Sequence, residues 1–231
     1  MPKLCKSFVM SLFLSAFSFA LGDGGTWVKL GIPDPIGFLV LGAIVSGFFV
    51  IASVYYRSHM GGHAKKLSFI LIAIPVVTST LYMSAATVHL NLQSVTGGPV
   101  HWHADYEIWA CGEEHELIDP EGFENRVGTP TVHEHNDNRI HIEGVLLDLE
   151  EASLQEYFES IGGDFDGVSL SIPTDEGLKG WENGDLCNGL PARWYVFVNE
   201  QLKEDGQDHV IAPYPTVPPG DVIKFVFTEK P

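Results

Sequence analysis

Cysteine, methionine and basic side chains are scarce in the second half of this 231-residue chain. The three cysteines form no CxxC motif, which argues against a thiolate zinc knuckle or a thioredoxin-type site. No methionine occurs in residues 96–231, so a blue-copper site with an axial methionine is excluded there. The chain has no Gly-x-Ser-x-Gly elbow, P-loop or dinucleotide-binding fingerprint, and nothing in it indicates nucleophilic catalysis.

The excess of acidic over basic residues is confined to one part of the chain. Residues 1–95 contain six Lys/Arg and two acids, whereas residues 96–231 contain seven Lys/Arg and 28 acids, a formal charge of −21. A domain with this charge repels nucleic acid and anionic lipid headgroups, and it attracts cations. We therefore expect no nucleic-acid partner and a water-exposed domain.

The first 95 residues have the pattern of a membrane anchor. Two uncharged segments, residues 36–56 and 67–88, are long enough to span a bilayer. The basic loop between them predicts a cytoplasmic location by the positive-inside rule. The N-terminal segment, residues 1–22, is either a signal peptide or a first membrane helix. This predicts a multi-pass protein of the cell membrane with residues 96–231 outside the cytoplasm.

The outer part, residues 96–231, has the periodicity of a small α+β domain. Residues 101–110 alternate between polar and apolar side chains, and further strands are expected at 115–118, 139–145, 194–198 and 222–228. A single helix is expected to begin at a capping box formed by Asp148 and Glu151 and to end at Gly162. Residues 164–191 read as irregular, and residues 119–138 as a polar loop. The pattern predicts a mixed β-sheet with one packed helix, similar to a β-grasp fold.

Histidines and carboxylates gather between Val100 and Gly144. Side chains two residues apart on a strand share a face, so the first strand presents His101, His103 and Asp105 together. His141 and Glu143 share a face of a later strand in the same way. A second His-x-His pair, at positions 133 and 135, precedes that strand. The apolar residues that alternate with them would face the core. The polar face is thus the candidate metal site, whereas His115 and His209 lack this support and are interpreted as surface residues.

Imidazole nitrogens bind Cu(II) and Zn(II) well, and copper is the first choice here, followed by zinc. The expected ligands are His101, His103, His133, His135 and His141. The carboxylates of Asp105 and Glu143 would bind the ion or orient a histidine by accepting its ring N–H. For the two His-x-His pairs to meet, the loop at 119–138 must fold back over the first strand.

Two classes of function remain open from this pattern. One is a membrane-anchored protein that captures, stores or delivers an extracytoplasmic metal ion, with a membrane protein as a possible partner. The other is a metal-dependent enzyme, cupin-like or hydrolytic, in which Glu107, Glu134 or Glu143 is the general base.

Two cysteines, Cys111 and Cys187, lie in the acidic domain. In an oxidising compartment they are expected to form a disulfide. In the alternative, Cys111 is a thiolate ligand and favours copper.

Two known motifs partly overlap this segment. HxHxD opens the metallo-β-lactamase signature, but Tyr106 stands where its next histidine belongs. His101, His103 and Glu107 fit the spacing of a cupin motif, but the flanking glycines and the second cupin motif are missing.

The segments HWHADYEIW and HEHNDNRIHIEG resemble a largely uncharacterised group of secreted or membrane-anchored archaeal and bacterial proteins. The shared pattern is HxHA, then HxH followed by Asp or Asn, then IHxE, and the resemblance covers residues 100–228. Asp105 stands at a position where that group often has another histidine. The resemblance implies a metal site and no particular reaction.

Overall fold

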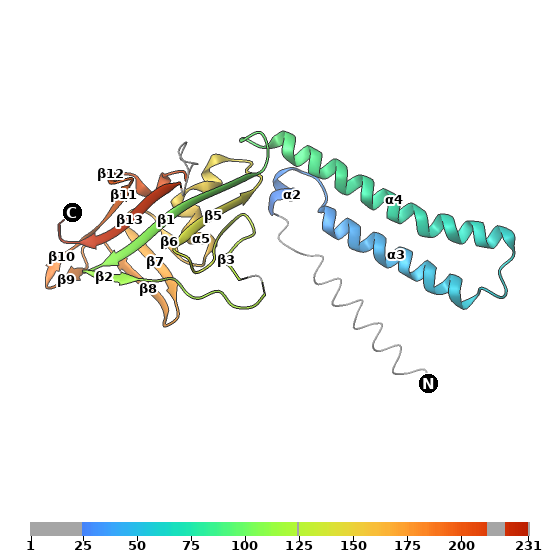
Figure 1. Ribbon diagram of the computed structural model, residues 1–231, viewed down its shortest axis with the longest axis horizontal. Coiled ribbons are helices and arrows are strands. Elements are labelled where there is room, and N and C mark those ends of the chain that lie inside the picture. The colour runs from blue at the N-terminus through green and yellow to red at the C-terminus, as the bar shows by residue number, and fades with distance from the viewer. Residues whose placement is uncertain (1–24, 124, 212–219, 231) are drawn as a thin grey trace. The chain divides into compact units, whose positions relative to one another are not determined.

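The computed structural model describes residues 25–123, 125–211 and 220–230 (Figure 1). They divide into two compact units, a helical one ending at Leu92 and a β-rich one beginning at Gln93. The predicted signal peptide or first membrane helix, residues 1–22, lies outside the described residues and stays a prediction.

The described part of the helical unit contains three helices. They are α2 (Gly25–Lys29), α3 (Pro35–Tyr55) and α4 (Gly62–Gln93). The carboxylate of Asp34 caps α3 by accepting the backbone N–H groups of Ile36 and Gly37 at 3.0 and 2.9 Å. Pro35 follows at the first helical position, where its missing N–H is no loss.

Helices α3 and α4 are long and apolar enough to cross a membrane. At 1.5 Å per residue, α3 extends over about 31 Å, close to the hydrocarbon thickness of a bilayer. Small residues lie where the two helices approach each other: a Cβ atom added to Gly42 would lie 2.2 Å from Ser79 Oγ. Close approach at small residues is typical of packing between membrane helices.

The β-rich unit is built on an eight-stranded mixed sheet. Its order is β12-β11-β13-β1-β5-β4-β3, and β2 pairs with β1 off this path. The bounds are β1 (Val100–Ala110), β2 (Glu113–His115), β3 (Val127–Gly128), β4 (Val132–Glu134), β5 (Arg139–Gly144), β11 (Arg193–Val198), β12 (Gln201–Lys203) and β13 (Asp221–Thr228). The central pair, β1 and β13, runs parallel, whereas β5 and β11 run antiparallel to their central neighbours.

Alternation along these strands separates the core from the open face, as the sequence predicted. On β1, Ala104, Tyr106 and Ile108 are buried while Glu107 is exposed. On β5, Ile140 and Ile142 are fully buried. One face of the sheet therefore packs into the core, and the other carries the polar side chains.

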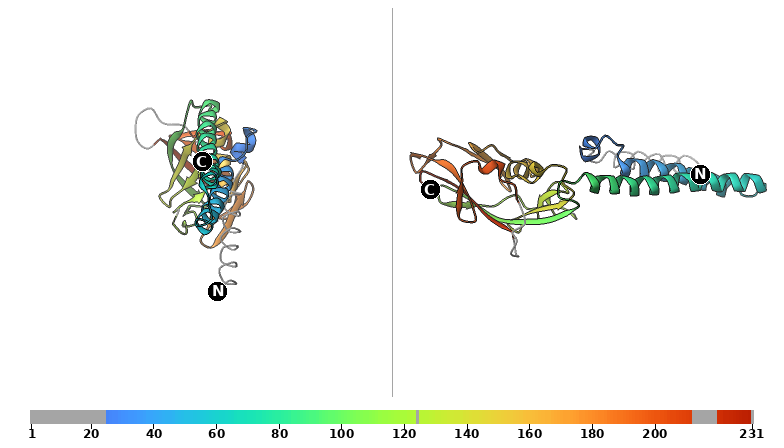
Figure 2. Two further views of the ribbon diagram at one scale, coloured as in Figure 1. Left: turned by 90° about the vertical axis from the view of Figure 1, so that its right-hand side faces the viewer. Right: turned by 90° about the horizontal axis from the view of Figure 1, so that it is seen from above.

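The buried face is covered by α5 (Leu154–Ser160), which lies against the sheet (Figure 2). Phe158 of α5 packs edge-on against Phe225 of β13, with ring centroids 5.1 Å apart. The predicted helix is present but shorter than expected. Asp148 caps only a 3-10 turn, η1 (Leu149–Ala152), and Ser153 caps α5 by accepting the N–H of Glu156.

The interpretation of residues 164–191 as irregular is wrong. This segment forms a three-stranded sheet, β6-β7-β8, and a small hairpin. The bounds are β6 (Asp164–Phe165), β7 (Ser169–Thr174), β8 (Gly177–Glu182), β9 (Leu186–Cys187) and β10 (Leu190–Pro191). Leu170, Ile172 and Thr174 alternate inward on β7. The Gly, Asp and Asn residues between these strands obscured this short period-two pattern.

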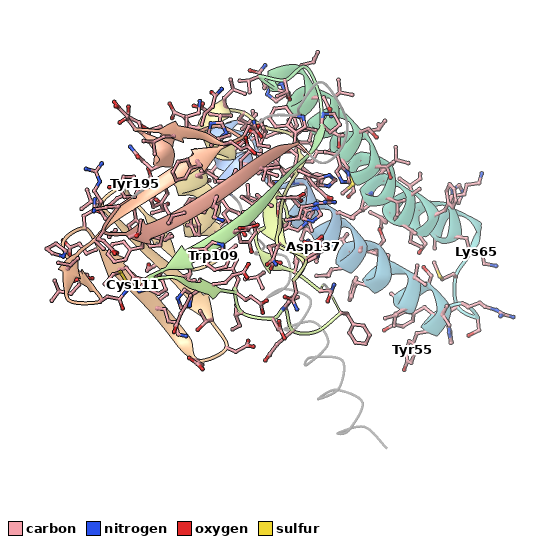
Figure 3. The ribbon with its side chains drawn as sticks, turned by 60° about the vertical axis from the view of Figure 1, so that its left-hand side comes forward. Tyr55, Lys65, Trp109, Cys111, Asp137 and Tyr195 are labelled. Carbon is pink, nitrogen blue, oxygen red and sulfur yellow. A yellow bond between two sulfur atoms is a disulfide. The ribbon has the colours of Figure 1, made fainter. Side chains whose placement is uncertain are left out.

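Cys111 and Cys187 form a disulfide, which confirms that prediction (Figure 3). The bridge joins the end of β1 to β9 across a sequence separation of 76 residues. Cys111 has left the strand conformation, with a φ of 53°. Both sulfurs are used in the bridge, so Cys111 is not a thiolate ligand in this structure.

Candidate metal centre

Three adjacent strands bring the histidines together. Strand β5 lies between β1 and β4, and its His141 is directly opposite His103 of β1 and His133 of β4. Neighbouring strands are about 4.8 Å apart, so the three imidazoles form a row across the sheet. The loop at 119–138 does not fold back over β1. Instead it contributes β4 to the sheet, and β5 separates the two His-x-His pairs.

Within each His-x-His pair the ring nitrogens are close. The Nε2 atoms of His101 and His103 are 3.0 Å apart, and those of His133 and His135 are 3.1 Å apart. Two imidazoles bound to one ion at about 2.0–2.1 Å have nitrogens about 2.8–3.4 Å apart, for bond angles from 90° to tetrahedral. The spacing that a metal ion requires is thus already present in both pairs.

His141 completes a set of three with each pair. The outer set is His101, His103 and His141, and the inner set is His133, His135 and His141. In each set the candidate ligand atoms lie within 4.8 Å of one another. The sets differ in exposure: the side chain of His101 is 64% exposed, whereas the whole of His133 is only 2% exposed. Each set has three imidazoles, which is enough to hold Cu(II) or Zn(II).

Carboxylates accompany both sets. Glu143 Oε1 is 3.3 Å from His101 Nε2. Asp137, labelled in Figure 3, places Oδ2 3.3 Å from His141 Nε2. The sequence prediction named Glu143 but missed Asp137. The i,i+4 spacing of Asp137 and His141 was visible, but it pointed to a contact only once the turn between them was known.

The second predicted carboxylate, Asp105, lies on the expected face of β1 but is engaged elsewhere. Its Oδ1 accepts the Nε–H of Arg139 at 2.7 Å in an ion pair. Asp105 belongs to neither set of candidate ligands. The structure therefore places it beside the cluster, as a partner of Arg139.

The Nδ1–H of His135 donates to the backbone carbonyl of Asn125. That contact assigns the ring proton to Nδ1 and leaves the Nε2 lone pair free for a metal ion. The Nδ1 atoms of His133 and His141 are buried without a partner among the described residues. His135 is therefore the candidate ligand whose orientation is best determined by its surroundings.

Burial keeps the central imidazoles neutral. Desolvation is the largest cause that lowers the pKa of His103, His133 and His141 below the ordinary value of 6.5. For His141 the nearby Asp137 raises the pKa and opposes part of this effect. A neutral imidazole has a free lone pair, so these three side chains are ready to bind a metal ion at neutral pH.

Metal affinity is expected to fall with decreasing pH, but only in the acidic range. Protons compete with the ion for ring nitrogens, and ordinary histidines would begin to lose this competition near pH 6.5. Because the pKa values here are lowered, zinc affinity should hold through about pH 6.5 and fall only at more acidic pH. Zinc titration of the full-length protein in detergent between about pH 5 and 8 measures this. A loss of affinity that is already steep above pH 7 would contradict it.

Of the three glutamates considered as general bases, only Glu143 faces a cluster histidine. Glu107 accepts from Trp109 Nε1 at 2.9 Å and pairs with Lys224 at 3.1 Å. Glu134 is 1% exposed, burial raises its pKa, and it accepts the backbone N–H of Asp137 at 2.9 Å. Glu134 thus holds the turn that carries Asp137.

The two remaining histidines of the β-rich unit lie outside the cluster. His115 packs on Trp181, with ring centroids 4.7 Å apart, and lines a separate cavity of about 440 Å³. The interpretation of His209 as a plain surface residue is wrong. Its side chain is 19% exposed and pairs with Asp221 at 2.9 Å.

Comparison of the chain with protein-family models, with curated proteins and with solved structures found no match. The function is therefore inferred from the chemistry of the histidine cluster and from the composition of the two units.

Proposed function

We propose that this protein is a membrane-anchored metal-binding protein whose β-rich unit captures, stores or delivers copper or zinc outside the cytoplasm. The observation that carries the proposal is the convergence of five histidines, four on three adjacent strands and His135 directly after β4, with paired Nε2 atoms 3.0 and 3.1 Å apart. Surface histidines without a role have no reason to gather at the spacing of metal ligands. The resemblance of the two histidine segments to a group of secreted and membrane-anchored proteins also supports a metal site at this cluster.

Copper is the first choice of metal. Imidazole sites favour Cu(II) in the Irving–Williams order, and an extracytoplasmic site lacks cytosolic control of metal supply. The paired nitrogens at 3.0 and 3.1 Å lie between the about 2.9 Å of a right-angled site and the about 3.3 Å of a tetrahedral one, so their spacing suits either ion. Zinc is the second choice because the sets contain three imidazoles each and no sulfur ligand.

The location outside the cytoplasm is supported by three features. The two apolar helices flank a basic loop, which the positive-inside rule assigns to the cytoplasm. The disulfide suits an oxidising compartment. The charge of −21 on residues 96–231 suits a water-exposed unit that attracts cations. A membrane protein that receives or supplies the ion is the expected partner.

The β-grasp-like arrangement also belongs to the proposal. It is supported by the parallel pairing of the first and last strands, β1 and β13, at the centre of the sheet. The antiparallel neighbours on each side and the helix α5 between β5 and β11 in the chain support it further. This central parallel pair speaks against a cupin, whose double-sheet jelly roll is antiparallel.

The topology predicts which residues an impermeant thiol reagent can reach in intact cells. A cysteine introduced at Glu121 is expected to be labelled, because that exposed residue lies in the outer unit. A cysteine introduced at His59, in the loop between α3 and α4, is expected to be labelled only after the cells are lysed. Labelling with the opposite pattern would overturn the topology.

The metal proposal is tested by titrating the full-length protein in detergent with Cu²⁺ and Zn²⁺. Replacing His135 with alanine should lower the affinity for the preferred ion by more than about 100-fold, since losing a ligand costs more than losing a residue that only orients one. Replacing His103 should lower it by a smaller factor, up to about tenfold. His115→Ala is the matched control and should leave the affinity unchanged. Equal, weak effects from all three substitutions would mean adventitious surface binding.

A metal-dependent hydrolase is the second candidate. It is favoured by the outer set, where the side chain of His101 is open to solvent and the Glu143 carboxylate lies 3.3 Å from His101 Nε2. Three protein ligands leave a coordination position for water, and a nearby carboxylate can take its proton. Turnover of model esters or phosphoesters that Glu143→Gln abolishes, with metal binding retained, would favour this candidate.

A further inference from the structure

The five histidines do not form a single ligand set. The candidate ligand atoms among the described residues fall into two groups of three, and the groups have only His141 in common. Neither group joins His101 or His103 to His133 or His135. In this arrangement an ion held by the pair on β1 has His141 as its third imidazole, and so does an ion held by the pair at β4.

The two sets lie at different depths. In the outer set the side chain of His101 is 64% exposed, and Glu143 stands beside it at the surface. In the inner set His133 is 2% exposed, and the shared His141 is 9% exposed. An ion arriving from solvent meets the outer pair first, whereas an ion in the inner set is shielded from water.

We propose that the two sets are two positions for one ion, which enters at the outer set and comes to rest in the inner set. This inference rests on the proposed metal-binding function and names its entry route. His141 belongs to both positions, so it stays bound while the other two ligands are exchanged. The bonds to His101 and His103 break and bonds to His133 and His135 form. Each imidazole stays neutral with one ring proton, and no electron is transferred.

Several contacts favour the inner position as the resting one. The carbonyl of Asn125 holds His135 with Nε2 free, so this ligand has little freedom to lose on binding. The inner set is buried, and a cation is attracted more strongly by imidazole and carboxylate groups where water is excluded. Asp137, 3.3 Å from His141 Nε2, supplies a nearby negative charge. Among the described residues, the carboxylate that accompanies the exposed outer pair is Glu143, 3.3 Å from His101 Nε2.

The experiment uses the full-length protein in detergent with Zn²⁺ as the probe. The unaltered chain is expected to bind one ion. The outer variant, His101→Ala/His103→Ala, should also bind one ion, with affinity within about tenfold of the unaltered chain but with association slowed by about tenfold or more. The inner variant, His133→Ala/His135→Ala, should bind one ion more than about 100-fold more weakly and release it to a chelator at once. His115→Ala is the control for both.

Three results would overturn the two-position route. One is a similar large loss of affinity in both double variants, which would mean one site made from all five histidines. Another is two ions bound per unaltered chain, and the third is unchanged association kinetics in the outer variant. Because alanine at the buried His133 can disturb folding, the single variant His135→Ala repeats the inner test at a partly exposed position. Failure of the unaltered chain to bind Zn²⁺ or Cu²⁺ would instead contradict the proposed function itself.

Discussion

The variant His141→Ala is expected to bind copper and zinc more than about 100-fold more weakly than the unaltered protein, the largest effect of any single substitution in the cluster. His141 lies opposite both His103 and His133 in the sheet and belongs to both candidate ligand sets. Every other histidine of the cluster belongs to one set. Removing the shared imidazole therefore leaves two separate His-x-His pairs, each with only two imidazole ligands.

The measurement is a competition titration against a chelator of known affinity. His141 is buried, so His141→Gln serves as a second variant that keeps most of the side-chain volume without the ring nitrogens. Both variants should lose affinity while unfolding close to the temperature of the unaltered apo-protein. If His141→Ala and His115→Ala bind the ions equally well, the cluster is not a metal site.

Removing the disulfide is expected to destabilise the β-rich unit by about 2–4 kcal/mol without changing metal affinity. The bridge closes a loop of 76 residues between the end of β1 and β9. A cross-link over such a distance restricts the unfolded chain strongly, and this raises its free energy. Both half-cystines lie outside the two histidine sets, so the ligands should keep their positions.

The variant Cys111→Ala/Cys187→Ala and the unaltered protein treated with a reductant should give the same shift in a denaturation curve followed by tryptophan fluorescence. Agreement between the two separates the cross-link from the cavity that alanine leaves at the fully buried Cys187. An unchanged midpoint in both would show that the bridge contributes nothing to stability. A parallel loss of zinc binding would show that the bridge also positions the ligands.

The local pattern of side chains was sufficient for much of the fold. Alternation along residues 100–110 and 139–144 placed Ala104 and Ile140 in the core and His103 and His141 on the open face, because the side-chain period of a strand is two. Long uncharged segments predicted α3 and α4, because the length of a hydrophobic segment can be read directly from consecutive residues. The histidines that form the cluster were visible as two His-x-His pairs and a His-x-Glu.

Only the tertiary structure decided how these pieces combine. Strand order is a non-local property, and nothing near His133 indicated that β5 would lie between the two pairs and make His141 the shared member. The pairing of Asp105 with Arg139 likewise follows from strand register, which moved a predicted carboxylate away from the cluster. Asp137 joined the site because a turn held by the buried Glu134 directs it to His141. The sequence by itself thus determined which side chains face away from the core, and register and strand order determined which of them meet.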